Sequence, residues 1–162
     1  MSHSILITGA SGYLGGSLLA SLSRTELPLH KKLYALVRST QQAEAVKKYG
    51  AESLVLDLQN EEAVVKTIVD AKISIVYFLV DALKSHLQIP LIKALGEVKK
   101  QTGEEVHFLH TSGAKIFSEH AGFPTDREIR DTDPNLYNLQ KTTNAPHPIM
   151  KLVGLYSLYK AS

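Results

Sequence analysis

The chain has no cysteine among its 162 residues. Disulfides, thiolate zinc sites and cysteine nucleophiles are therefore excluded, and the absence is consistent with the cytoplasmic location that we expect. The formal net charge is only +2, which gives no electrostatic reason to expect nucleic acid or a membrane surface as a partner. The longest apolar run, Ile73 to Val80, is far too short to span a bilayer.

What the chain does have is a glycine-rich opening, in which an apolar run, 5–7, leads directly into Gly9, Gly12 and Gly15. In a strand–turn–helix unit, the first glycine permits a tight turn, and the second lets the backbone approach a pyrophosphate. The third lets the helix pack on the strand, and the first N–H groups of the helix face the phosphate. The alternative is a turn that binds no ligand. The predicted pyrophosphate site consists of Gly9, Ser11, Gly12, Tyr13, Leu14 and Gly15.

Apolar runs alternate with helix-like segments over the next hundred residues or so. This order is typical of a parallel sheet with right-handed crossovers. We therefore expect an α/β fold with a doubly wound, Rossmann-type sheet of about five strands in the order 3-2-1-4-5. Strands are predicted at 5–7, 33–37, 53–56, 73–80 and 106–110, and helices after the glycine-rich turn and at 40–49, 60–69 and about 84–100, unless Pro90 marks a later start.

The pattern changes after Thr111. Residues 112–133 resemble a long loop, and Asp133-Pro134 is typical of a helix N-terminus. Two prolines, at 146 and 148, stop that helix. We expect a dinucleotide-binding domain over residues 1–145 and a C-terminal helical segment over 146–162. Because the open edge of the fifth strand invites pairing, we expect that segment to cover the edge or the chain to form a homo-oligomer.

The end of the second predicted strand indicates which nucleotide binds. An acidic residue there would accept hydrogen bonds from the ribose hydroxyls of NAD. This chain has Arg38 instead, followed by Ser39 and Thr40, and a guanidinium with two hydroxyls favours the 2′-phosphate of NADP. The alternative is an ordinary surface arginine. Asp57 and Leu58, just past the third strand, are further candidates; Asp57 either accepts from the adenine amino group or solvates the strand end.

Three residues are candidates for catalysis. Ser112 follows the fifth strand, and ligands of open α/β sheets bind at the carboxyl ends of strands. Tyr137 and Lys141 lie four positions apart and share a helical face. An ammonium beside a phenol favours its ionised form, so the phenol could exchange a proton with a substrate oxygen that Ser112 holds. The spacing alone is weak evidence, because Tyr156 and Lys160 repeat it.

The stretch Thr8–Gly15 resembles the TGxxGxxG fingerprint of the short-chain dehydrogenase/reductase superfamily. The resemblance is greatest to its extended and atypical branches, which hold sugar-nucleotide epimerases, dehydratases and NmrA-like proteins, and it covers roughly residues 4–141. In that family, a serine after the fifth strand and a Tyr-x-x-x-Lys pair form the catalytic set. Ser112, Tyr137 and Lys141 match that set in order and spacing.

The resemblance implies an NADP(H)-dependent oxidoreductase or epimerase that acts on a carbonyl or secondary alcohol, with no metal. NAD is the less favoured cofactor. Family members usually continue well beyond this length and build most of the substrate pocket there, so the sheet is expected to be incomplete relative to theirs. The alternatives are a non-catalytic nucleotide-binding or regulatory module of the NmrA-like kind and an inactive truncated relative.

Overall fold

The computed structural model describes residues 2–25, 30–81 and 86–142. The described residues fall into two units, one formed by residues 2–25, 30–81 and 86–111, the other by residues 112–142. Each unit is described by itself. The C-terminal segment predicted at 146–162 lies outside the described residues.

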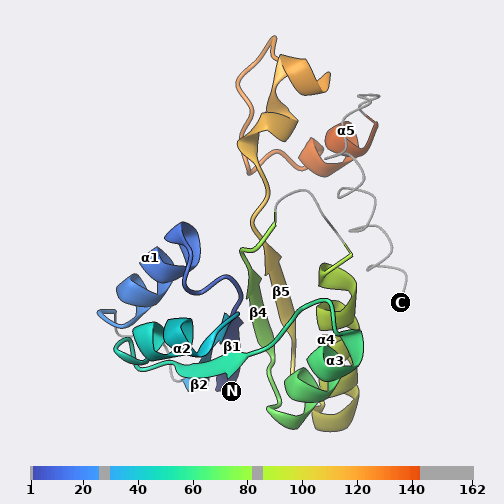
Figure 1. Cartoon of the computed structure of the whole chain (residues 1–162). Coiled ribbons are helices and arrows are strands. Elements are labelled where there is room, and N and C mark those ends of the chain that lie inside the picture. Colours follow the sequence, from blue (N-terminus) through green and yellow to red (C-terminus); the bar gives the residue numbers. More distant parts are fainter. Residues whose placement is uncertain (1, 26–29, 82–85, 143–162) are drawn as a thin grey trace. The chain divides into compact units, whose positions relative to one another are not determined.

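The first unit is a parallel sheet with helices on both faces (Figure 1). Its strands lie in the order β3-β2-β1-β4-β5, and every neighbouring pair is parallel. The predicted fold class and strand order are therefore confirmed. The strands are β1 (His3–Ile7), β2 (His30–Val37), β3 (Glu52–Val55), β4 (Ile75–Phe78) and β5 (His107–His110).

Four helices connect these strands, and local capping explains where several of them begin or end. The Asn60 side chain accepts a hydrogen bond from the Ala63 N–H and so caps α3. Gly50, with φ +74°, follows α2. Pro90 lies in the first turn of α4, where a missing N–H costs no helical hydrogen bond. The helices are α1 (Tyr13–Leu22), α2 (Thr40–Lys47), α3 (Glu61–Asp70) and α4 (Gln88–Thr102).

Two apolar layers hold the sheet, one on each face. Leu6 belongs to the layer that includes residues of α3 and α4, whereas its neighbour Ile7 belongs to the layer that includes residues of α1 and α2. Successive side chains of a strand point to opposite faces, so burial of both faces accounts for the nearly continuous apolar strands of the sequence. Across the described ranges, no helix has the length and hydropathy that a membrane span requires.

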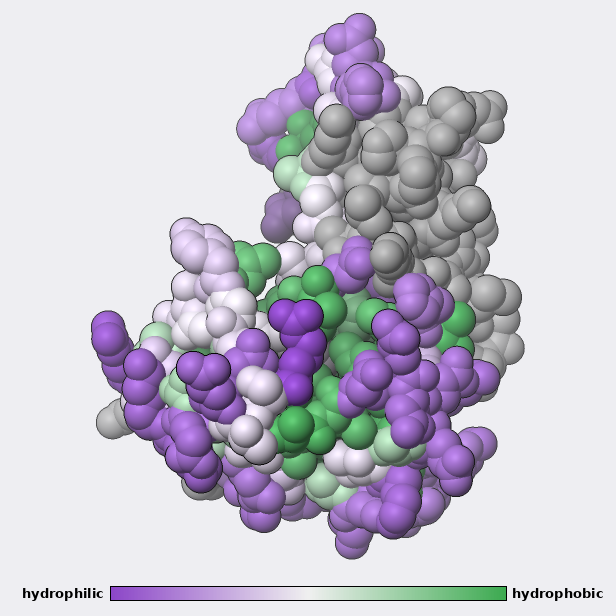
Figure 2. Space-filling view, in the orientation of Figure 1, coloured by the Kyte–Doolittle hydropathy of each residue, from purple (hydrophilic) through white to green (hydrophobic). Residues whose placement is uncertain are grey.

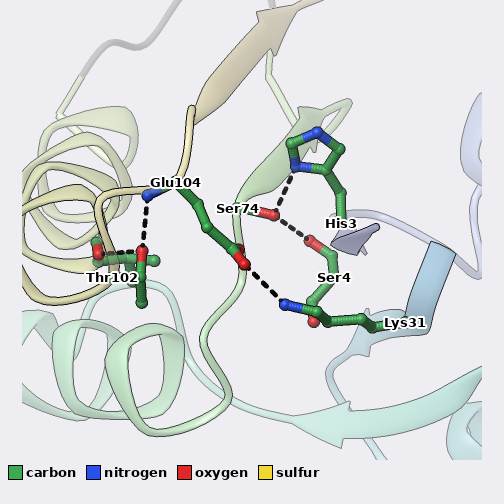
Figure 3. Close-up of polar contacts among 7 residues, drawn as sticks. His3, Ser4, Lys31, Ser74, Thr102 and Glu104 are labelled. Carbon is green, nitrogen blue, oxygen red and sulfur yellow. Dashed lines mark hydrogen bonds and ion pairs between the residues drawn. The ribbon is translucent and has the colours of Figure 1, made fainter. Parts of the chain in front are cut away.

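Polar contacts join the strands at their amino ends (Figure 3). Nδ1 of His3 lies 3.0 Å from Oγ of the buried Ser74. Lys31 forms a 2.8 Å ion pair with Glu104, and this contact holds the pKa of Glu104 below its usual value. β2 begins at His30, three residues before the predicted start, because its first residues pair with β1.

The second unit is not the plain loop that its sequence predicts. Residues 114–117 and 119–121 form short 3₁₀ helices. Phe117 and Phe123 pack edge to face with their centroids 5.4 Å apart, so a small apolar contact gives the segment its structure. Asp133 behaves as a helix N-terminal residue, because Oδ1 accepts from the Asn135 N–H. Helix α5 (Leu136–Thr142) follows.

Candidate functional site

A cleft of about 730 Å³ lies at the carboxyl ends of the strands in the first unit. It occupies the edge of the sheet where open α/β folds bind their ligands. Figure 2 shows hydrophobic residues gathered in the middle of one face of this unit, between more polar surfaces. Six of the residues predicted to bind a cofactor line this one cleft: Gly9, Ser11, Gly12, Arg38, Asp57 and Leu58.

The glycine-rich turn has the geometry that its sequence predicts. Gly9 adopts φ +63°, and its carbonyl accepts from the Gly12 N–H at 2.9 Å. A Cβ on Gly15 would stand 2.3 Å from the Gly9 carbonyl oxygen, a separation that no side chain tolerates. Gly15 therefore lets α1 pack directly on the turn.

The amino end of α1 is available to an anion. Gly12 is its N-cap and provides no side chain to bond the free N–H groups, and the first turn holds no acidic residue. Unbonded N–H groups and the positive end of the helix dipole together favour a phosphate. Tyr13 and Leu14, which begin the helix, have side chains 89% and 52% exposed. Any contact of these two with a phosphate at this point would come from their backbone N–H groups.

A buried hydroxyl joins the glycine-rich turn to the neighbouring strand. Oγ1 of Thr8 donates to the Tyr77 carbonyl at 3.3 Å and accepts from the Leu79 N–H at 3.0 Å. Thr8 is fully buried, and both Gly9 and Leu79 line the cleft. The hydroxyl thus fixes the two walls of the cleft relative to each other.

Arg38 leaves the end of β2 with an exposed side chain. Its backbone N–H donates to Oε1 of Gln42 at 2.9 Å, and Ser39 caps α2 by accepting from the Gln42 N–H at 3.3 Å. In the part of the chain that the structure describes, no carboxylate forms an ion pair with the Arg38 guanidinium. The positive charge is therefore available to a ligand in the cleft.

Asp57 is exposed, and its Oδ1 accepts from the Gln59 N–H at 2.9 Å. One carboxylate oxygen thus stabilises the turn after β3, which agrees with the interpretation that Asp57 solvates the end of the strand. Leu58 is 7% exposed and belongs to the core as well as to the cleft wall.

Sequence reasoning missed much of the lining. Val55 and Val80 are 52% and 45% exposed, and both line the cleft, where they offer an apolar surface to a flat ring. Leu79 and Leu87 also line the cleft, as does Gln42. Leu79 and Val80 could have been identified as lining residues because they directly follow a strand. Gln42 could have been identified from the Ser-x-x-Gln spacing of a capping box.

The three predicted catalytic residues belong to the second unit. Ser112 is exposed, and Tyr137 is 39% exposed on α5. Lys141 follows on the same helix. Their catalytic role stays a prediction.

One histidine at the carboxyl end of the sheet has a shifted pKa. His110, the last residue of β5, has its pKa lowered from 6.5 by burial, against a smaller raising effect of the Asp81 charge. Its Nδ1 lies 3.5 Å from the amide nitrogen of Gln88, and its buried Nε2 has no hydrogen-bond partner among the described residues.

The fold and the glycine-rich cleft define a domain of the NAD(P)-binding Rossmann class. Residues 1–125 match the NmrA-like family, and the chain belongs to that family. No curated protein sequence shows significant similarity to it.

Solved structures share the fold. The UDP-Glc/GlcNAc 4-epimerase of Campylobacter jejuni is 18% identical with a TM-score of 0.60, over 99% of this chain and 49% of its own. An isoflavone reductase is 20% identical with a TM-score of 0.58, over 99% and 47%. The triphenylmethane reductase of Citrobacter sp. is 20% identical with a TM-score of 0.55, over 98% and 46%. The chain spans about half the length of these proteins.

Proposed function

We propose that the cleft binds NADP(H) in preference to NAD(H). The observation that carries the proposal is the Arg38 guanidinium, which has no ion-pair partner among the described residues and lies in the same cleft as an uncapped, glycine-rich helix N-terminus. In this arrangement the pyrophosphate meets the N–H groups at the start of α1, and the adenine lies against Val55 and Val80. Arg38 neutralises the 2′-phosphate, which only NADP(H) carries.

Calorimetric titration of the full chain with NADPH and with NADH tests the proposal. Arg38→Ala should weaken NADPH by about 1.5–3 kcal/mol, the range for a hydrogen bond to a charged group, and should leave NADH nearly unchanged. Arg24→Ala is the matched control, because Arg24 is also exposed but lies outside the cleft. Equal affinities of the wild type for the two nucleotides would refute the proposed preference.

We further propose that the protein is an oxidoreductase or epimerase acting on a carbonyl or secondary alcohol. The reduced nicotinamide supplies hydride when bound. Tyr137 then gives a proton to the substrate oxygen, Lys141 stabilises the phenolate, and Ser112 holds that oxygen. The match of these residues to the catalytic set of the resembled superfamily supports the proposal, as do solved structures named as reductases and an epimerase.

A panel of carbonyl compounds with NADPH tests for turnover. Tyr137→Phe should abolish NADPH oxidation and leave NADPH affinity unchanged, whereas Tyr49→Phe, outside the cleft, should affect neither. The second candidate is a non-catalytic nucleotide-binding or regulatory module of the NmrA-like kind, which the match of residues 1–125 to the NmrA-like family favours. Tight NADPH binding without turnover by the wild type would support it.

The oligomeric state is a separate proposal. β5 is an edge strand of the sheet, and Leu109 on it is 46% exposed. An edge of this kind pairs readily with another chain, so we expect a homo-oligomer in light scattering, or else the C-terminal segment folded over the edge. A monomer in which that segment is disordered would contradict this.

A further inference from the structure

The carboxamide of Gln42 has a fixed orientation. A backbone N–H can only donate, so the group that meets the Arg38 N–H at 2.9 Å is the oxygen Oε1. The amide nitrogen Nε2 is therefore the atom of this side chain that can donate a hydrogen bond to another group. Within the described ranges, Nε2 has no protein partner, and Gln42 is half-buried in the wall of the cleft.

This orientation comes from the start of α2. Ser39 caps the helix by accepting from the Gln42 N–H at 3.3 Å, and the Ser39 carbonyl accepts from the Ala43 N–H at 3.0 Å. Gln42 thus occupies the third helical position, from which a capping-box side chain reaches back. The same side chain holds the main chain of Arg38, and both residues line the cleft.

We propose that Gln42 is a specificity-determining residue, which donates a hydrogen bond from Nε2 to the 2′-phosphate of NADP(H) while its Oε1 holds the main chain of Arg38. The inference rests on the proposed function, since it concerns the nucleotide that the cleft selects.

The choice between glutamine and glutamate at this position is informative. Capping boxes use either residue, because both supply an oxygen that accepts a backbone N–H. A glutamate would hold Arg38 equally well, but its second oxygen would repel a phosphate. Glutamine replaces that oxygen with a donor, and the first turn of α2 contains no acidic residue. The position therefore suits an anion as well as the helix.

Gln42→Glu separates the two roles, because it keeps the acceptor for Arg38 and removes the donor. The probes are adenosine 2′,5′-bisphosphate and AMP, titrated calorimetrically into the full chain; they differ only in the 2′-phosphate. The variant should bind the bisphosphate at least about tenfold more weakly, the scale of one lost charged hydrogen bond. Its affinity for AMP should stay within about twofold of the wild type.

Gln41→Glu is the matched control. Gln41 neighbours Gln42 on the same helix and is exposed outside the cleft, so it carries the same charge change and should keep most of the bisphosphate affinity. Gln42→Met, which loses both roles, should weaken the bisphosphate and also lower the thermal midpoint, whereas Gln42→Glu should keep the midpoint.

The outcomes separate the two proposals. A wild type that binds both probes equally refutes the NADP preference, and this inference with it. A wild type that prefers the bisphosphate, with a Gln42→Glu variant that keeps the preference, refutes the role of Gln42 alone. The role of Gln42 would also be refuted if Gln42→Glu weakened the binding of both probes equally, or if Gln42→Glu and Gln41→Glu weakened the bisphosphate equally.

Discussion

Gly15→Ala is expected to be among the most damaging small substitutions in the first unit. The new Cβ would stand 2.3 Å from the Gly9 carbonyl oxygen and 2.8 Å from the Ala10 Cα. Both are backbone atoms, so relief requires α1 to move away from the turn. Overpacking of this kind costs about 3 kcal/mol, which corresponds to a drop of roughly 6–12 °C in Tm for a chain of this length. Because the turn itself is displaced, affinity for the dinucleotide should fall as well.

Gly16→Ala provides the control at the next position. A Cβ there meets its nearest atom, the Ala10 carbonyl oxygen, at 3.6 Å, an ordinary contact. Alanine in a helix is more stable than glycine by about 0.5–1 kcal/mol, so this variant should be slightly more stable than the wild type. Urea unfolding followed by circular dichroism measures both changes. If Gly15→Ala is as stable as Gly16→Ala, the close packing of helix and turn is refuted.

Two further predictions concern residues that sequence reasoning did not select. Thr8→Val should lower the free energy of unfolding in urea by about 1–3 kcal/mol, because it leaves the Leu79 N–H unsatisfied. Thr8→Ser keeps the hydroxyl and should recover most of this loss. If the two variants lose the same stability, the hydroxyl does not stabilise the fold. The pKa of His110 in the folded chain is lowered from 6.5, so on acidification the unfolded chain takes up this proton at a higher pH than the folded chain does. Stability should therefore fall as the pH decreases from about 6.5 through the folded pKa. His110→Gln should flatten this dependence when urea midpoints at about pH 7.5 and 5.5 are compared; an unchanged slope would contradict the assignment.

The fold was predictable because its signals are local. Alternating apolar runs and the three glycines act within a few residues, and handedness rules then restrict the strand order. The start of β2 was not predictable, because His30 and Lys31 are polar and their place in the strand depends on pairing with β1, which no local pattern indicates.

The candidate site likewise contains residues that local sequence predicts and residues that it does not. Arg38 and the glycines follow from position after a strand. The role of Thr8 depends on Leu79, 71 residues away in the sequence, and no local pattern indicates that pairing. Gln42 lies between these cases, since its capping-box spacing is visible in the sequence but its contact with the Arg38 N–H is not.

The central claim is that a dinucleotide binds at the start of α1 with its 2′-phosphate at Arg38. Amide chemical shifts of the ¹⁵N-labelled full chain, followed during titration with NADPH and then NADH, test it most directly. We predict large shifts at Gly9, Gly12 and Gly15 with both nucleotides, and at Arg38 and Gln42 with NADPH alone. No shifts at the glycines, or shifts confined to other surfaces, would contradict it.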